Sequence, residues 1–407
     1  MVLRIPKVSL STIIVLFPIL YYNSCTFEFI KPYSFTLPLV GVFLLAWLVL
    51  LAREGATINV RNLLPMVVYA FLLLVLVLMG ATKRVEILSS DMNNALYMLI
   101  FMCVLGIYSG EQYKNDRTFI VSVWLADTVI TCVYSIYRLI NEPNLSRLLS
   151  TGSYHATEEA VAARGIASFG VIYGLVLIVL AIFYLVLQSK KKRFVNICLF
   201  TLFLVLLFLA QFLIAIGLVA IGMIWMLFIN NPTNSKNKRI HSICFIILGV
   251  VFIFCLPFLL RFLADNDVFG YEIDARLEEI MVLFNGGDLE GTDISARFTQ
   301  YTMSLKAFFT SYGMGKIAMP AVEVGYHSGW LDGLGNYGIL FLLHIASLFA
   351  FRSFVLERLP NQKSKQLYRM LFVIYIIMSL TNTSTWAPIT LSLCVIVPFV
   401  CMDKVSE

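Results

Sequence analysis

The stretch that decides the fold is K-K-K-R-F-V-N-I-C-L-F-T-L-F-L-V-L-L-F-L-A-Q-F-L-I-A-I-G-L-V-A-I-G-M-I-W-M-L-F-I-N, residues 190–230. As one helix, its apolar part (194–230) would be roughly 55 Å long at 1.5 Å per residue, against ~30 Å of bilayer hydrocarbon. A second basic cluster, residues 236–239, follows it. Because both basic flanks belong in the cytoplasm, the run has to cross the membrane twice. We therefore predict two short spans with their turn near Gln211, on the outer side.

The composition extends this interpretation to the whole chain. Hydrophobic residues make up 60% of the 407 and charged residues 13%, which is typical of an all-α polytopic membrane protein. The first apolar run follows Arg4 and Lys7 without a small-residue cleavage site, so we expect a retained helix rather than a signal peptide. Twelve transmembrane helices are predicted, near residues 8–24, 33–52, 62–82, 92–109, 118–140, 166–187, 194–209, 212–229, 240–262, 334–351, 367–382 and 387–402.

The distribution of basic residues fixes the predicted orientation. With both termini in the cytoplasm, 19 of the 30 Lys and Arg fall on inner segments and three on the short outer turns. This asymmetry follows the positive-inside rule. The eight Cys form no CxxC pair, so neither a disulfide framework nor a zinc site is predicted.

Two long outer segments carry the functional information. We expect one integral membrane domain over residues 1–407, with a first outer loop at 141–165 and a large outer loop at 263–333. Helical periodicity in the large loop predicts short helices at 273–284 and 295–310. Long loops on a rigid scaffold are where binding and catalysis concentrate. No P-loop and no GxGxxG before a helix is found, so neither nucleotide use nor a nucleic-acid partner is expected.

Three arginines on the predicted outer face suggest an anionic ligand: Arg164, Arg276 and Arg297. A guanidinium offers a planar fork of donors that binds phosphate bidentately and keeps its charge near a membrane. The alternative is local pairing at helical spacing, of Arg276 with a neighbouring Glu and of Arg297 with Asp293.

The end of the large loop reads E-V-G-Y-H-S-G-W-L-D-G-L-G-N-Y-G, residues 323–338. His327 is a candidate general base or phosphate ligand, and packing at a loop edge is the structural alternative. Asp332 could orient His327 or cap the next helix. Trp330 and Tyr326 fit an aromatic belt at headgroup level and a platform for sugar rings equally well.

These motifs resemble a known family. R-F-T-Q-Y-T-M-S-L-K-A-F-F-T-S-Y-G-M-G (297–315), followed by Y-H-S-G-W-L-D-G-L-G-N-Y-G-I-L (326–340), is similar to the core signature of the Wzy-type polysaccharide polymerases in the O-antigen ligase and polymerase superfamily. The resemblance covers the topology and the motifs of roughly residues 272–340, with weaker support from R-G at Arg164.

The resemblance implies a GT-C-like glycosyltransferase of the bacterial inner membrane, with its active site on the periplasmic side. Such enzymes join undecaprenyl-pyrophosphate-linked repeat units into O-antigen, capsule or exopolysaccharide, and they need neither cofactor nor metal. By motif, Arg297 and Arg164 would bind pyrophosphate, Arg276 would add a third cationic contact, and His327 would lie at the reacting centre. The expected partners are the lipid-linked donor and acceptor and membrane lipids, and a chain-length regulator is compatible with this role. One departure is the turn at Gln211, where many members carry a Ser-Arg pair.

Two alternatives stay open. The first is a ligase of the same superfamily, which transfers finished glycan to a different lipid acceptor; the H-S-G-W-L-D motif favours the polymerase. The second is a transporter or flippase, for which Asp127 and His344 are the clear mid-span ionisable candidates.

Overall fold

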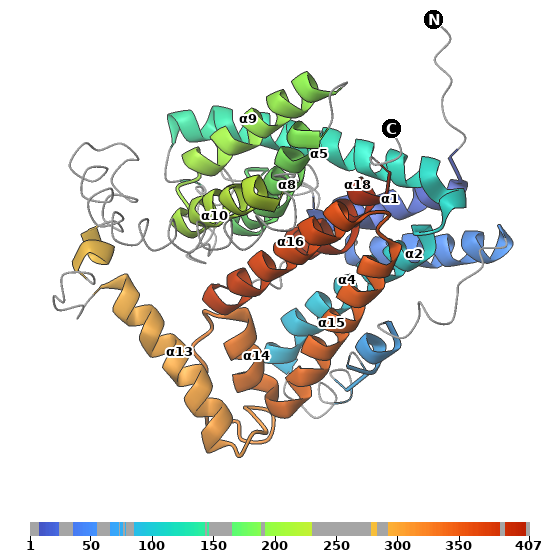
Figure 1. The fold of residues 1–407 in the computed structure, drawn as a ribbon. Helices are drawn as coiled ribbons and strands as arrows, with labels where there is room; N and C mark the ends of the chain where they lie inside the picture. Colours follow the sequence, from blue (N-terminus) through green and yellow to red (C-terminus); the bar gives the residue numbers. More distant parts are fainter. Residues whose placement is uncertain are drawn as a thin grey trace, which may run out of the picture.

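A computed structural model of the chain describes residues 8–23, 36–54, 66–72, 74–75, 78, 85–142, 145, 165–188, 192–229, 278–282, 292–382 and 387–403. All regular structure in these ranges is helical (Figure 1). The helices with defined bounds are α1 (Leu10–Asn23), α2 (Thr36–Arg53), α4 (Val85–Tyr108), α5 (Lys114–Asn141), α8 (Phe169–Gln188), α9 (Arg193–Leu209), α10 (Leu213–Ile229), α13 (Asp293–Thr310), α14 (Gly329–Tyr337), α15 (Phe341–Arg358), α16 (Gln362–Thr381), α17 (Ala387–Leu391) and α18 (Val397–Asp403). A π-helical turn, Ser392–Ile396, joins α17 to α18.

Helix α8 lies at the centre of the bundle. Residues 170–182 are buried without a break, and the helix packs against α9, α10, α16 and α17. A helix that is apolar on every side lies either in a protein core or in lipid, and the burial of α8 shows that other helices enclose it. The core of the described part of the protein is therefore built around α8.

Nine described helical segments have the apolar character of membrane spans. Three are long enough to cross a bilayer: Glu111–Asn141, Phe169–Gln188 and Gly329–Arg358. The shorter apolar segments are Leu10–Tyr21, Gly41–Arg53, Leu96–Tyr108, Arg193–Leu209, Leu213–Leu227 and Ala387–Met402. The predicted span 240–262 and most of 62–82 lie outside the described residues, so the total of twelve stays a prediction.

The predicted hairpin within 194–230 is confirmed. The run divides into α9 and α10, and Gln211 lies in the turn between them with a positive φ of 57°. Both helices pack against α8. The side of the membrane on which this turn lies stays a prediction.

Another predicted span differs from the structure. Residues 334–351 were expected as one helix, but α14 ends at Tyr337 and a short 3-10 turn, Gly338–Leu340, separates it from α15. Gly338 has a φ of +58°, a conformation that ends helices and that glycine adopts without a Cβ penalty. The 3-10 turn therefore interrupts the predicted helix near its start, within the apolar segment Gly329–Arg358, which is long enough to cross a membrane.

The exposed face of α5 has the character of a surface that contacts lipid. Ile130, Val133, Tyr137 and Ile140 are each between 54% and 66% exposed, and their spacing of three or four residues places them on one side of the helix.

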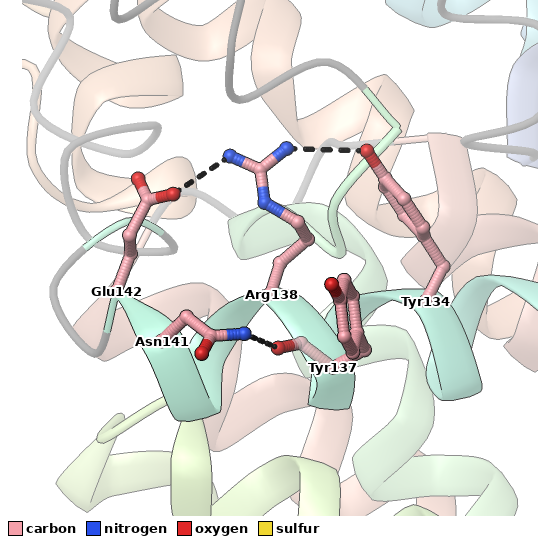
Figure 2. Close-up of polar contacts among 5 residues, drawn as sticks. All are labelled: Tyr134, Tyr137, Arg138, Asn141 and Glu142. Carbon is pink, nitrogen blue, oxygen red and sulfur yellow. Dashed lines mark hydrogen bonds and ion pairs between the residues drawn. The ribbon is translucent and has the colours of Figure 1, made fainter.

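Polar contacts mark the C-terminal end of this face (Figure 2). The Arg138 guanidinium donates to Tyr134 Oη at 3.2 Å and to Glu142 Oε1 at 3.1 Å, and Asn141 Nδ2 donates to Tyr137 O at 2.9 Å. Tyr and Arg are typical of the zone where hydrocarbon meets headgroups. An exposed ion pair of this kind contributes little stability, so we interpret the cluster as marking the level at which the apolar face ends.

A polar cluster joins the start of α1 to α5. The Asp116 carboxylate accepts hydrogen bonds from Ser9 N (3.0 Å), Ser9 Oγ (2.9 Å) and Thr12 Oγ1 (2.7 Å). A carboxylate in this place also stabilises the positive end of the α1 dipole. Nearby, Ser11 Oγ donates to Glu54 Oε2 at 2.6 Å, which adds the end of α2. The helix ends assigned to the inner side by the sequence therefore lie together in this cluster.

Candidate functional site

Helix α13 supplies one side of the candidate site. It begins after Thr292, whose side chain caps the first turn by accepting a backbone hydrogen bond. Arg297, Tyr301 and Ser304 follow at positions i, i+4 and i+7, so they share one face of the helix. Tyr301 Oη donates to Thr381 O at 2.7 Å, which directs this face toward the C-terminal end of α16. The predicted helix at 295–310 is confirmed.

A buried hydrogen bond joins this face to α14. Ser304 Oγ donates to Asp332 Oδ1 at 2.5 Å, and the second carboxylate oxygen, Oδ2, accepts from Ser328 N at 2.7 Å. Ser304 is fully buried and Asp332 is 8% exposed. Gly325 N donates to Ser304 Oγ at 3.0 Å. The loop before α14 is therefore fastened to α13 on one side and to Asp332 on the other.

Consecutive backbone amides surround the Asp332 carboxylate. Besides the Ser328 amide, those of Tyr326 and His327 face it. Tyr326 adopts a left-handed backbone conformation, with φ +56°. Such a residue turns successive N–H groups toward one point and forms an anion-binding nest. In this structure the anion in the nest is the side-chain carboxylate of Asp332.

His327 lies against Tyr301. The two ring centroids are 6.2 Å apart and the rings are tilted by 41°. The imidazole is half-buried, and its Nε2 atom is enclosed by protein. His327 is thus next to the face of α13 that carries Arg297, one helical turn before Tyr301.

The start of α14 is anchored to α16 and, through it, to α8. Ser328 Oγ donates to Ser379 O at 3.2 Å, and Gly329 N donates to Asn382 O at 3.0 Å. Asn382 Nδ2 in turn donates to Tyr173 Oη at 3.1 Å. These contacts bring the ends of three helices to the base of the loop, so His327 is carried on a rigid support.

Gly325 is required here by close packing. A Cβ atom at this position would lie 2.1 Å from Gln300 O, a backbone atom of α13. The loop and the helix are therefore in direct backbone contact, which a side chain at this position would prevent.

Six of the seven sequence-predicted residues fall into three groups, and the seventh is Tyr326. His327 and Arg297 lie on the two facing sides of the site. Trp330 packs against the hydrophobic core of the bundle, and its Nε1 atom is buried without a hydrogen-bond partner in the described structure. Asp332 is occupied by internal hydrogen bonds, so it caps the start of α14 and organises the loop. Arg164 and Arg276 lie outside the described residues.

Tyr326 faces away from the core and is 53% exposed. Lys316 Nζ donates to Tyr326 Oη at 3.1 Å and lies 5.5 Å from the centroid of its ring. The phenol is therefore held at the surface, where a sugar or a lipid headgroup can reach it.

Tyr301 and Ser304 were not predicted as site residues, although they make the contacts of α13 with α16, His327 and Asp332. The available signal was their spacing after Arg297, which places all three on one helix face. Across the described ranges, no group of three or more His, Cys, Asp and Glu side chains is arranged to hold a metal ion.

Comparison with known proteins gives no match to this chain among family models, curated proteins or solved structures.

Proposed function

We propose that the protein is a membrane glycosyltransferase that joins lipid-linked oligosaccharide repeat units into a polysaccharide. The observation that carries the proposal is the contact between His327 and Tyr301, one turn along α13 from Arg297. In this proposal His327 is the proton acceptor, and Arg297, one helical turn before Tyr301 on α13, is the permanent cation. The motifs that resemble the Wzy-type polymerases support the same proposal.

In the proposed reaction, His327 removes the proton from an acceptor sugar hydroxyl. The hydroxyl oxygen forms a bond to the anomeric carbon of the donor, and the bond from that carbon to the undecaprenyl pyrophosphate oxygen breaks. Arg297, with Arg164 and Arg276 as further cations, stabilises the negative charge that develops on the pyrophosphate.

The site performs two further tasks in this proposal. The hydrogen bonds of Asp332 fix the loop from Tyr326 to Ser328, which keeps the imidazole in place for the attack. Tyr326 borders the sugar at the surface. The polysaccharide is an O-antigen, capsule or exopolysaccharide, and the site faces the periplasm of an inner membrane.

The transport alternative stays open, and the structure describes the surroundings of His344, one of its two mid-span candidates. His344, a mid-span candidate for that function, is buried, shares a 3.0 Å hydrogen bond with Tyr69 Oη and stacks on Phe341 at 4.9 Å between ring centroids. These contacts give the imidazole a packing role between helices.

One reconstitution experiment tests the proposal. Purified protein in lipid vesicles is supplied with undecaprenyl-pyrophosphate-linked repeat units, and the products are separated by size. A ladder of lengthening products supports the polymerase. A single transfer to a different lipid acceptor would identify the ligase, and movement of the substrate across the bilayer without a new glycosidic bond would identify a transporter.

A further inference from the structure

Two turns pack back to back at the far end of α13 and form an apolar projection, here called the tip: Tyr312, Met314 and Ile339. Ile339 N donates to Gly313 O at 2.8 Å, and a Cβ atom on Gly338 would lie 2.1 Å from that same oxygen. The turn after α13 is therefore in direct backbone contact with the turn before α15.

The side chains of the tip are exposed although they are apolar. Tyr312 is 91% exposed, Met314 49% and Ile339 57%. Tyr312, Gly313 and Gly338 have positive φ, and the hydrogen bond from Ile339 N to Gly313 O holds the two turns together. Exposed apolar side chains gathered in this way mark an interaction surface.

The tip is continuous with the apolar face of a candidate membrane span. Ile339 is followed on α15 by Leu342, Ala346 and Phe349, all exposed and spaced by three or four residues, so they form one stripe. These residues belong to the segment Gly329–Arg358, which is long and apolar enough to cross a membrane. The exposed stripe is the side that this span offers to lipid.

The charge around the tip is suited to a lipid surface. Residues 294–322 contain Arg297, Lys306 and Lys316 and no Asp or Glu. Lys and Arg near a bilayer are attracted to anionic headgroups, and aromatic side chains favour the same zone. In Figure 1, α14 lies between α13 and α15. The tip lies where the turn after α13 meets the turn before α15, so it is at the N-terminal end of α15.

From these observations we infer that the tip is seated in the headgroup region of the adjacent lipid leaflet and contacts lipid there. This contact has a consequence for the site, because Lys316, two residues after Met314, holds Tyr326, the neighbour of His327. The depth of the tip in the lipid therefore sets the height of His327 relative to the membrane. The inference concerns membrane contact and does not depend on the proposed reaction.

Spin labelling tests the inference without an activity measurement. Tyr312→Cys is introduced into the full chain with its eight native Cys replaced, and Glu323→Cys, at an exposed acidic position of the following loop, is the matched control. The labelled proteins are placed in vesicles of phosphatidylethanolamine and phosphatidylglycerol. Collision with oxygen, which partitions into lipid, is compared with collision with a water-soluble nickel complex.

We expect the label at position 312 to favour oxygen and the label at position 323 to favour the nickel complex, with at least a several-fold difference between their collision ratios. Met314→Cys provides a second position with the same expectation if the first variant fails to fold. Equal preference of both labels for the nickel complex would overturn the inference. Dipolar broadening between labels at position 312 would also overturn it, because it would show that a second copy covers the tip.

Discussion

Ser304 and Asp332 share a buried 2.5 Å hydrogen bond that joins α13 to α14. Ser304 also accepts from Gly325 N, and Asp332 also accepts from Ser328 N. The bond therefore closes a polar ring around the loop that carries His327. Such networks are costly to leave partly satisfied, because each buried group that loses its partner still bears the desolvation penalty.

Asp332→Asn is expected to destabilise this region. The amide supplies one acceptor oxygen in place of two, and its NH₂ group faces backbone donors, so one buried bond is replaced by a clash of donors. A cost of about 1–3 kcal/mol follows, measured as a lower midpoint of thermal unfolding in detergent. Glu323→Gln, at an exposed position, is the charge-matched control and should leave the midpoint unchanged. Equal midpoints for the two variants would show that the Asp332 carboxylate is not needed.

Gly325→Ala is expected to separate the loop from α13. The added Cβ would meet Gln300 O at 2.1 Å, and a backbone atom can move aside only with its helix. Gly217→Ala in α10 is the matched control, since no atom lies within 4 Å of its Cβ position. That change should be neutral or stabilise by about 0.5–1 kcal/mol, because Ala favours a helix interior over Gly. Unfolding midpoints that fall equally for both variants would contradict the proposed close contact.

Arg297→Ala should lower the rate of chain growth by roughly 10²–10³-fold, since one charge-assisted contact to a leaving group contributes about 2.7–4 kcal/mol in the transition state. Arg164→Ala should act in the same way. Lys at either position should restore activity only in part, because it lacks the bidentate fork. Lys306→Ala, on the exposed side of α13, is the control and should polymerise normally. Full activity of both Arg variants would show that these cations do not stabilise the leaving pyrophosphate.

His327→Ala should lose most of the polymerase activity while it retains binding of the lipid-linked donor, because a general base contributes roughly 10²–10⁴-fold in rate. His327→Gln should bind donor and remain nearly inactive. Product ladders and donor binding are measured on the same preparations. A normal rate for His327→Ala would assign the imidazole a structural role, and loss of donor binding would place it with the phosphate-binding arginines.

Gln211→Cys tests the orientation of the α9–α10 hairpin. In a chain whose other cysteines have been replaced, a thiol at this turn should react with an impermeant reagent added from the periplasmic side. Gln112→Cys, before α5, is the control that should react from the cytoplasmic side. Reversed labelling of the pair would invert the proposed topology.

The hairpin and the helix at 295–310 could be predicted because their signals are local. Basic clusters flank α9 and α10, and apolar periodicity runs along α13. Ser328 before Gly329 is likewise a local cap signal for the start of α14, since its side chain accepts from Leu331 N.

The internal arrangement of the site could not be predicted in the same way. Ser304 and Asp332 are 28 residues apart, and nothing in either neighbourhood identifies the other as its partner. The left-handed conformation of Tyr326 could not be predicted either, because residues with large side chains rarely adopt a positive φ. Both features arise from tertiary contacts that override local preference.

The bonds between Ser9 and Asp116 impose an order on how the nascent chain matures. The two residues are 107 positions apart, so at a synthesis rate of about 5–20 residues per second the start of α1 waits roughly 5–20 s for its acceptor to be made. During that interval the hydroxyls of Ser9 and Thr12 can bond to each other, as they do in the folded protein at 2.6 Å, but they lack their carboxylate acceptor. The first helix therefore reaches its final set of hydrogen bonds only after α5 has been made.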